Sequence, residues 1–188
     1  RSIVITRPAG QADSLCAALA ALGAEPLRFP LLTISPVHDR APLAAMARRL
    51  GEFSLAFFVS PNAVKFGLDA LLRVRPWPTG LAVSTVGKGS EAALAARGFQ
   101  QVIAPDSGFD SESVLALPAF QAPAVAGKGV LILRGDGGRD LLGDTLRARG
   151  ARVEYLTCYH RSGPIDEPAL LLERARAGRL DALTLTSS

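Results

Sequence analysis

Short runs of apolar residues alternate with amphipathic stretches along this chain, and glycine or proline stands at most of the boundaries. Residues 130–133 are four consecutive aliphatic residues, which is typical of a strand buried on both faces. Gly137 and Gly138 follow and permit a tight turn, and from Leu141 onward the apolar positions have helical spacing. Repetition of this order of strand, glycine loop and helix predicts an α/β protein with parallel sheets covered by helices.

The same pattern predicts the other elements. Strands are expected at 2–6, 25–29, 55–59, 81–86, 102–104, 152–157 and 181–186. Helices are expected at 10–22, 42–50, 61–72, 87–98, 110–117 and 167–177, the fifth with Ser111 as its N-cap. Residues 31–37 and 158–164 are extended and contain proline, so we expect them to cross between two lobes.

Residues 3–10 resemble residues 130–137, and the offset of 127 holds without a gap to the end of the chain. It pairs Arg7 with Arg134, Gly10 with Gly137 and Ser60 with Ser187. Although any two strand–helix units share some features, this register over about sixty residues indicates an internal duplication. Two full copies need 2 × 127 residues, and the second copy stops after 188 − 127 = 61. We therefore expect the first lobe to be incomplete, with about sixty to seventy further residues in the gene.

The composition is that of a globular protein, with 48% hydrophobic and 20% charged residues. The net charge of +4 suits an anionic ligand. The charge is too diffuse to indicate nucleic-acid binding, because the sequence has no run of Lys and Arg. Cys16 and Cys158 are isolated and are expected to be packing residues of a cytoplasmic protein. His38 and His160 have no ligand cluster beside them, so no metal is expected, and no apolar run is long enough to span a bilayer.

Hydroxyls, glycines and bases follow the predicted strands, with hardly a carboxylate among them. They include Thr6, Arg7, Ser60, Gly87, Lys88, Gly89, Ser90, Arg134, Gly135 and Ser187. Parallel α/β sheets bind ligands at the carboxyl ends of their strands, so this set predicts a site for carboxylates or phosphates. Capping of the next helix is the alternative role of Ser60, and the two roles are compatible.

Residues 135–140 resemble the dinucleotide-binding pattern GxGxxG, but Asp140 stands where the third glycine belongs. Glu154 lies about where an acid would bind the ribose, so a nicotinamide-dependent oxidoreductase is one alternative. A two-lobed anion-binding protein without catalysis is another. The sequence contains neither a P-loop nor a GxSxG motif.

An ordered set of short segments resembles the uroporphyrinogen-III synthase family of the haem and sirohaem pathway, over the whole chain. The set comprises Thr-Arg-Pro at 6–8, Phe-Val-Ser-Pro-Asn-Ala-Val at 58–64, Thr-Val-Gly-Lys-Gly-Ser at 85–90, segments 111–115, 132–135, 138–139 and 149–151, Tyr159, and Thr-Ser-Ser at 186–188. The resemblance implies two flavodoxin-like, parallel-sheet lobes joined by a two-stranded ladder, a HemD-like fold. Lobe 1 would comprise 1–32 and 162–188, lobe 2 would comprise 36–157, and 31–37 and 158–164 would be the linker strands.

The resemblance also implies a cyclising hydro-lyase without a cofactor. Its substrate would be hydroxymethylbilane, a linear tetrapyrrole with eight carboxylates, which it would close to uroporphyrinogen III with inversion of ring D and loss of water. Tyr159 would be the general acid, or alternatively a residue that packs between the lobes. Arg7, Ser60, Gly87, Lys88, Ser90, Arg134, Arg139 and Ser187 would bind substrate, although the arginines can also be solvated surface charges. A monomer without a nucleic-acid or membrane partner is expected.

Overall fold

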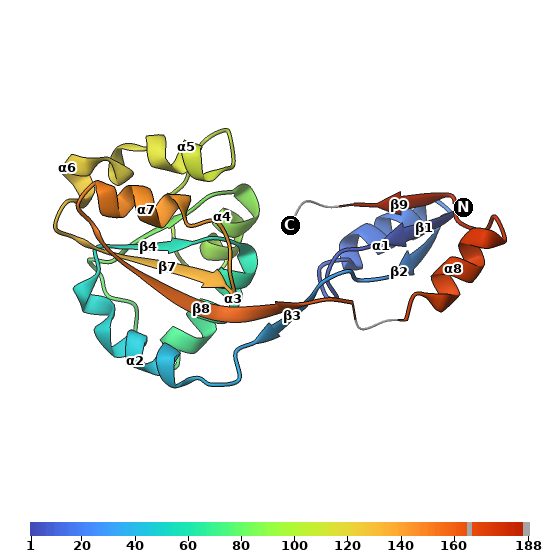
Figure 1. The fold of residues 1–188 in the computed structure, drawn as a ribbon, viewed down its shortest axis with the longest axis horizontal. Coiled ribbons are helices and arrows are strands. Elements are labelled where there is room, and N and C mark those ends of the chain that lie inside the picture. The colour runs from blue at the N-terminus through green and yellow to red at the C-terminus, as the bar shows by residue number, and fades with distance from the viewer. Residues whose placement is uncertain (165–166, 186–188) are drawn as a thin grey trace. The chain divides into compact units, whose positions relative to one another are not determined.

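The computed structural model describes residues 1–164 and 167–185, which alternate between strands and helices along most of their length (Figure 1). The first half contains β1 (Ser2–Ile5), α1 (Asp13–Ala21), β2 (Glu25–Arg28), β3 (Thr33–Pro36), α2 (Ala41–Arg49), the 3₁₀ turn Leu50–Glu52, β4 (Leu55–Phe58), α3 (Pro61–Leu72), β5 (Ala82–Thr85) and α4 (Lys88–Ala95). The second half contains β6 (Val102–Ile103), α5 (Ser111–Ala116), the 3₁₀ turn Pro118–Phe120, α6 (Ala122–Val125), β7 (Gly129–Gly135), α7 (Leu141–Ala148), β8 (Arg152–Ser162), α8 (Ala169–Arg176) and β9 (Ala182–Thr184). The predicted α/β class is confirmed.

The chain divides into two compact units. Unit 1 comprises Arg1–Ser35 and Arg161–Ser188, and unit 2 comprises Pro36–His160. The chain passes from one unit to the other within β3 and again within β8. The structure makes β8 one continuous strand, because its pairing with β7 runs through the point at 157 where the sequence suggested a break. The assignment of 31–37 and 158–164 as linker strands stays a prediction.

Unit 1 contains a three-stranded sheet in the order β2-β1-β9, and both pairings are parallel. A small core of Ile5, Ala12 and Cys16 packs beneath this sheet. α8 has no buried residue among those described, and its Arg174 forms an ion pair with Glu25 on β2, with 3.0 Å between Nη1 and Oε1. The described residues of unit 1 therefore bury few apolar side chains.

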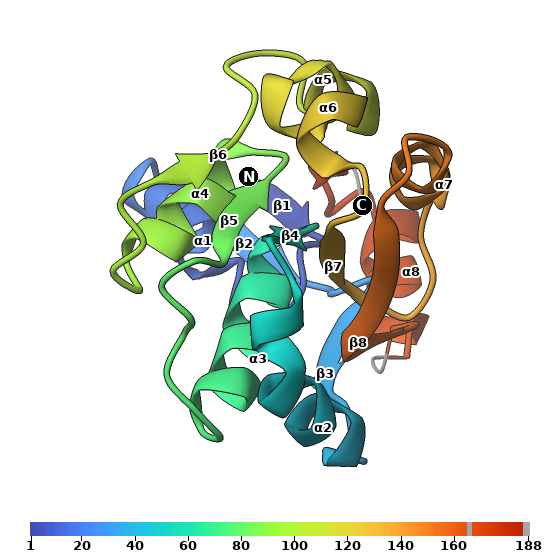
Figure 2. The ribbon, with the colours of Figure 1, turned by 90° about the vertical axis from the view of Figure 1, so that its left-hand side faces the viewer.

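The larger sheet has six strands in the order β3-β8-β7-β4-β5-β6, and unit 2 contains β4, β5, β6, β7 and most of β8. β7 and β4 lie at its centre and are buried on both faces, as their uninterrupted apolar runs predict. Figure 2 shows α2 and α3 on one face of the sheet and α5, α6 and α7 on the other. The core on the α5–α7 side includes Phe57, Phe120, Ile132 and Leu146, all at most 4% exposed.

Candidate functional site

The predicted anion-binding residues of unit 2 gather at one edge of its sheet. β5, β4 and β7 are parallel and in register, with Phe58 opposite both Thr85 and Leu133, so their carboxyl ends lie side by side. The Thr85 hydroxyl donates a buried hydrogen bond to the Phe58 carbonyl (2.7 Å), which ties two of these strand ends together. The strand ends, loops and helix starts at this edge carry Ser60, Gly87, Lys88, Arg134 and Arg139.

Ser60 is the N-cap of α3, as predicted. Its backbone is extended, Pro61 occupies the first helical turn, and its Oγ accepts a hydrogen bond from the Ala63 N–H at 3.1 Å. The same Oγ lies 3.0 Å from the Tyr159 hydroxyl, and either oxygen can be the donor. Because a hydroxyl has two lone pairs and one proton, Ser60 can accept from the helix and donate to Tyr159 at the same time.

Tyr159 reaches Ser60 because β8 contains a bulge. Arg134 on β7 pairs with Thr157, whereas the next residue, Gly135, pairs with Tyr159, so Cys158 is the extra residue. As a result Cys158 and Tyr159 are consecutive but both buried, at 1% and 4% exposed. The ring of Tyr159 lies against Gly135, where an added methyl group would be 2.6 Å from Cε2.

Phe66 is a site residue that the sequence analysis missed, and Gly135, which it included among the strand-end residues, has a role that it did not predict. Gly135 is the last residue of β7, and its missing side chain makes room for the Tyr159 ring. The Phe66 ring on α3 lies 6.0 Å from the Tyr159 ring, centroid to centroid. Only the position of Gly135 at the end of an apolar run could have suggested a close approach.

The predicted loop Gly87–Ser90 forms the start of α4. Gly87 is its N-cap and no side chain caps the helix, so its first N–H groups face the same edge as Ser60. Lys88 is exposed and pairs with Glu91 at 2.8 Å. Ser90 is only 3% exposed and its N–H bonds to the Gly87 carbonyl at 3.0 Å, so it is the least accessible residue of the predicted set here.

Arg134 is partly neutralised. Its Nη1 lies 2.8 Å from Asp140 Oδ1, and its guanidinium lies 3.9 Å above the centre of the Tyr155 ring. Tyr155 in turn requires Gly143, because a methyl group there would lie 2.0 Å from its hydroxyl. Arg139, in the loop that follows β7, is exposed.

The remaining predicted site residues lie elsewhere. Arg7 belongs to unit 1, two residues after β1, and is half-buried. Ser187 lies outside the described residues. The prediction that Ser111 caps α5 is wrong, because Asp110 accepts the Ser113 N–H at 2.8 Å and is the N-cap.

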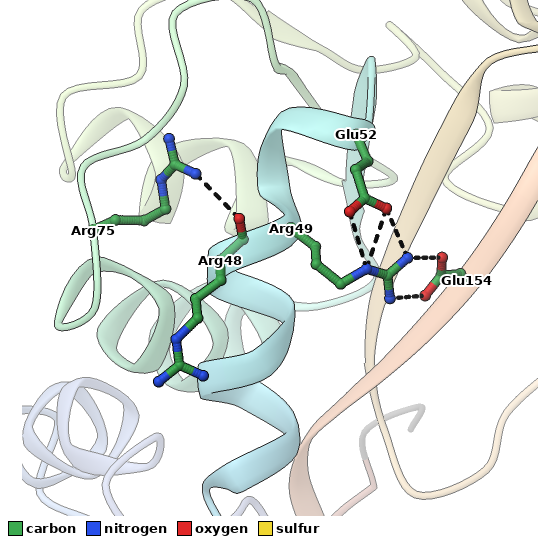
Figure 3. Close-up of polar contacts among 5 residues, drawn as sticks. All are labelled: Arg48, Arg49, Glu52, Arg75 and Glu154. Carbon is green, nitrogen blue, oxygen red and sulfur yellow. Dashed lines mark hydrogen bonds and ion pairs between the residues drawn. The ribbon is translucent and has the colours of Figure 1, made fainter.

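The structure does not support a nicotinamide site. The Glu154 carboxylate is held by both Nη atoms of Arg49, at 2.7 and 3.0 Å, and Arg49 also pairs with Glu52 (Figure 3). This carboxylate is therefore engaged with α2 instead of being available to a ribose. Arg75 donates to the Arg48 carbonyl nearby, at 3.3 Å (Figure 3).

Within the described ranges, no three His, Cys, Asp or Glu residues are grouped so that they could hold a metal ion. None of the helices in that part of the chain is both long and apolar enough to cross a membrane. Both cysteines are free and buried, as expected of packing residues. Burial raises the pKa of the Cys158 thiol to about 12, so it stays protonated near neutral pH.

Comparison with known proteins gives a consistent result. A family model described as "Uroporphyrinogen-III synthase HemD" matches residues 13–188. The chain is 40% identical to uroporphyrinogen-III synthase of Escherichia coli over 85% of its own length and 65% of that protein's length. It is 35% identical to the Proteus mirabilis enzyme of the same name, over 85% of this chain and 80% of the relative.

A solved structure of a uroporphyrinogen III synthase mutant from Thermus thermophilus has a similar fold, with a TM-score of 0.65. The two sequences are 21% identical, and the match covers 97% of this chain and 71% of the other. The chain spans 65% of the length of both its Escherichia coli and its Salmonella typhimurium relatives.

Proposed function

The chain belongs to the uroporphyrinogen-III synthase family, and from this premise we propose that it closes hydroxymethylbilane to uroporphyrinogen III. In this reaction the terminal hydroxyl of the linear tetrapyrrole leaves as water. The electrophilic azafulvene that remains is attacked by the substituted carbon of ring D, and the resulting spiro intermediate reopens and closes with that ring inverted. The proposal needs no cofactor.

The observation that carries this proposal is the hydrogen-bonded pair of Ser60 and Tyr159, 3.0 Å apart at the carboxyl edge of the unit 2 sheet. Ser60 accepts the Ala63 N–H, which leaves its own proton for Tyr159 Oη. Tyr159 then keeps its phenolic proton for the departing hydroxyl of the substrate and acts as a general acid. The close fit of the ring against Gly135 supports the proposal because it holds the phenol in one position.

Carboxylate binding by the loops at the same edge completes the proposal. The uncapped start of α4 at Gly87 offers N–H groups, and Lys88 and Arg139 offer positive charge. Ring closure without inversion occurs spontaneously, so the enzyme has to hold the linear tetrapyrrole in a conformation in which that closure cannot compete. Catalysis of this kind is mainly positional.

We also propose that the protein acts as a cytoplasmic monomer, with hydroxymethylbilane as its small-molecule partner. The free cysteines support a reducing compartment. The two-lobed division with linker strands at 31–37 and 158–164 belongs to this proposal too. Arg7 and Ser187 are then further substrate-binding residues.

Analysis of the product isomer tests the proposed function. The full chain is incubated with hydroxymethylbilane, the products are oxidised, and the type I and type III porphyrins are separated by chromatography. We expect type III to exceed the type I product of a protein-free control. Only type I at the protein-free rate would refute the proposal, and tight binding of the porphyrin without turnover would favour an anion-binding protein.

A further inference from the structure

The loop at 104–110, between β6 and α5, exposes an aromatic side chain. Phe109 is 55% exposed, and it is the only aromatic residue among the large, strongly exposed apolar side chains of the described residues. Single exposed apolar residues are common on protein surfaces, so exposure alone decides nothing. Its position relative to the candidate site and the charges around it are more informative.

The loop is held against the start of α5. Gly108 has φ +67°, and its carbonyl accepts the Asp110 N–H at 2.6 Å. A methyl group on Gly108 would lie 2.3 Å from the Ser113 Oγ, so the backbone packs closely on this helix. The backbone at Phe109 is therefore already ordered, which lowers the backbone entropy that the loop loses when a ligand binds.

Phe109 lies beside the start of α4. A methyl group on Gly87 would be 4.0 Å from Phe109 Cβ, so Phe109 adjoins the helix end that carries Lys88. The pKa of Lys88 is raised, mainly by its hydrogen bond to Glu91 and further by Asp106, the residue three positions before Phe109. Lys88 thus lies on one side of the loop.

Arg139 lies toward the other side. The pKa of Asp110 is lowered, mainly by hydrogen bonds from Ser113 and also by the positive charge of Arg139. α5 packs against α7, and both helices begin at the carboxyl edge of the sheet, as the arrowheads of β4 and β7 show (Figure 1). The loop that exposes Phe109 therefore lies at the edge where Ser60 and Tyr159 meet, close enough to Lys88 and Arg139 for their charges to act on its carboxylates.

We propose that Phe109 is a substrate-binding residue whose ring contacts a pyrrole ring, while Lys88 and Arg139 bind the carboxylates of that same pyrrole. A pyrrole with acetate and propionate side chains has an apolar face with anions at its rim, which complements an aromatic ring flanked by cations. This inference deepens the proposed function and rests on it.

Variants of Phe109 in the full chain test the inference. Binding of uroporphyrin III is measured by calorimetry, and KM and kcat are measured with hydroxymethylbilane. We expect Phe109→Ala to raise both Kd and KM about tenfold because an aromatic contact is lost. Phe109→Tyr, which keeps the ring, should stay within about twofold of the original Kd. Leu72→Ala is the matched control, since Leu72 is 39% exposed at the opposite end of α3.

A second ligand separates ring contact from charge. Coproporphyrin III keeps the macrocycle but has four carboxylates where uroporphyrin III has eight. Phe109→Ala should weaken binding of both porphyrins by the same factor, whereas Lys88→Gln should weaken binding of uroporphyrin III more. The melting temperature of Phe109→Ala should stay within about 2 °C of the original, which excludes a folding defect.

Three results would overturn the inference about Phe109: an unchanged Kd in Phe109→Ala, an equal loss in Leu72→Ala, or a loss in Phe109→Tyr as large as in Phe109→Ala. If the unaltered chain produces the type III isomer, such a result refutes only the role of Phe109. If the unaltered chain binds uroporphyrin III but does not convert hydroxymethylbilane, the proposed function fails, and the Kd values still decide whether Phe109 contacts the porphyrin. A chain that neither binds nor turns over contradicts both.

Discussion

The two units contain equivalent segments of a repeated sequence, exchanged between them. In unit 1, β1 pairs with β9 so that Ile3 lies opposite Ala182, and in unit 2, β7 pairs with β4 so that Val130 lies opposite Leu55. Adding 127 to Ile3 and to Leu55 gives Val130 and Ala182, so the two registers are the same. The β1–β2 and β7–β8 registers also correspond, because Ser2 lies opposite Glu25 and Gly129 opposite Arg152.

The equivalent glycine loops have the same conformation as well. Gly10 and Gly137 have φ of 78° and 76°, and Gly23 and Gly150 have 77° and 87°. Each unit therefore combines a strand–helix–strand segment from one copy with a later strand from the other. This agreement supports the duplication that the sequence indicates.

The two units differ in burial. β4 is fully buried because β5 and β7 flank it, whereas its equivalent β9 is largely exposed among the described residues. Likewise, α2 buries Leu43, Met46 and Ala47, but its equivalent α8 buries no described residue. The repeated pattern thus determines pairing and register, while the neighbours available in each sheet determine how much apolar surface is buried.

The largest expected effect comes from one substitution made at equivalent positions. Ile5 and Ile132 occupy the same place in the repeat and are 0% and 1% exposed. We expect Ile132→Ala to lower the free energy of unfolding of unit 2 by about 4 kcal/mol, and Ile5→Ala to cost unit 1 about 2 kcal/mol. The reason is that, among the described residues, Ile132 belongs to a core of eleven buried residues, whereas Ile5 shares its core with two other buried residues and three partly buried ones.

Denaturant unfolding measures this difference. The single tryptophan, Trp77, packs against Phe58 and, edge to face, against Phe99 in unit 2, so its fluorescence reports on that unit, whereas circular dichroism reports on both. Ile132→Ala should shift the fluorescence transition and Ile5→Ala should leave it nearly in place. Equal shifts from both variants would show that the units do not differ as described.

A smaller effect is expected from the equivalent arginines at the strand ends. Asp140 pairs with Arg134 in unit 2, but the equivalent Asp13 pairs with Arg28 and so does not neutralise Arg7. We therefore expect Arg7→Gln to raise KM about threefold to fivefold, and Arg134→Gln to raise it less than twofold. Both effects should shrink with added salt, because these charges are only partly buried and salt still screens them. A larger increase in KM for Arg134→Gln than for Arg7→Gln would contradict this assignment, and so would a KM that does not change with ionic strength.

Much of this arrangement could be predicted from the sequence, because strands, turns and helix caps depend on local patterns. Ser60 as a cap and the positive φ of Gly137 are of this kind. The bulge at Cys158 was not predictable, since it depends on how Tyr159 packs against Gly135 from another strand. The pairing of Glu154 with Arg49 was missed for the same reason, because those residues are 105 positions apart.

The smallest expected effect is the pH dependence of two exposed ion pairs, one in each unit. The pKa of Glu52 is lowered by Arg49, and the pKa of Glu25 is lowered by Ser2 and then by Arg174. A glutamate whose pKa is lowered in the folded state stabilises the fold fully at pH values above its ordinary pKa of 4.5. This contribution is lost as the pH falls through the lowered pKa. Glu52→Gln should therefore flatten the acid side of the unit 2 stability profile, followed by Trp77 fluorescence. Glu25→Gln should leave that profile unchanged, and an identical response to both changes would contradict the separation of the two pairs.

The two copies of the repeat also differ in the residue that we propose as the general acid. The position equivalent to Tyr159 is 159 − 127 = 32, where the chain has Leu32, so the phenol belongs to one copy only. The central claim is that this phenol, held by Ser60, protonates the departing hydroxyl of the substrate. The turnover number of Tyr159→Phe with hydroxymethylbilane, measured beside its melting temperature, tests this claim most directly. We predict that kcat falls by more than about tenfold while the melting temperature changes little. An unchanged kcat in a folded Tyr159→Phe variant would contradict the account and leave Tyr159 as a packing residue.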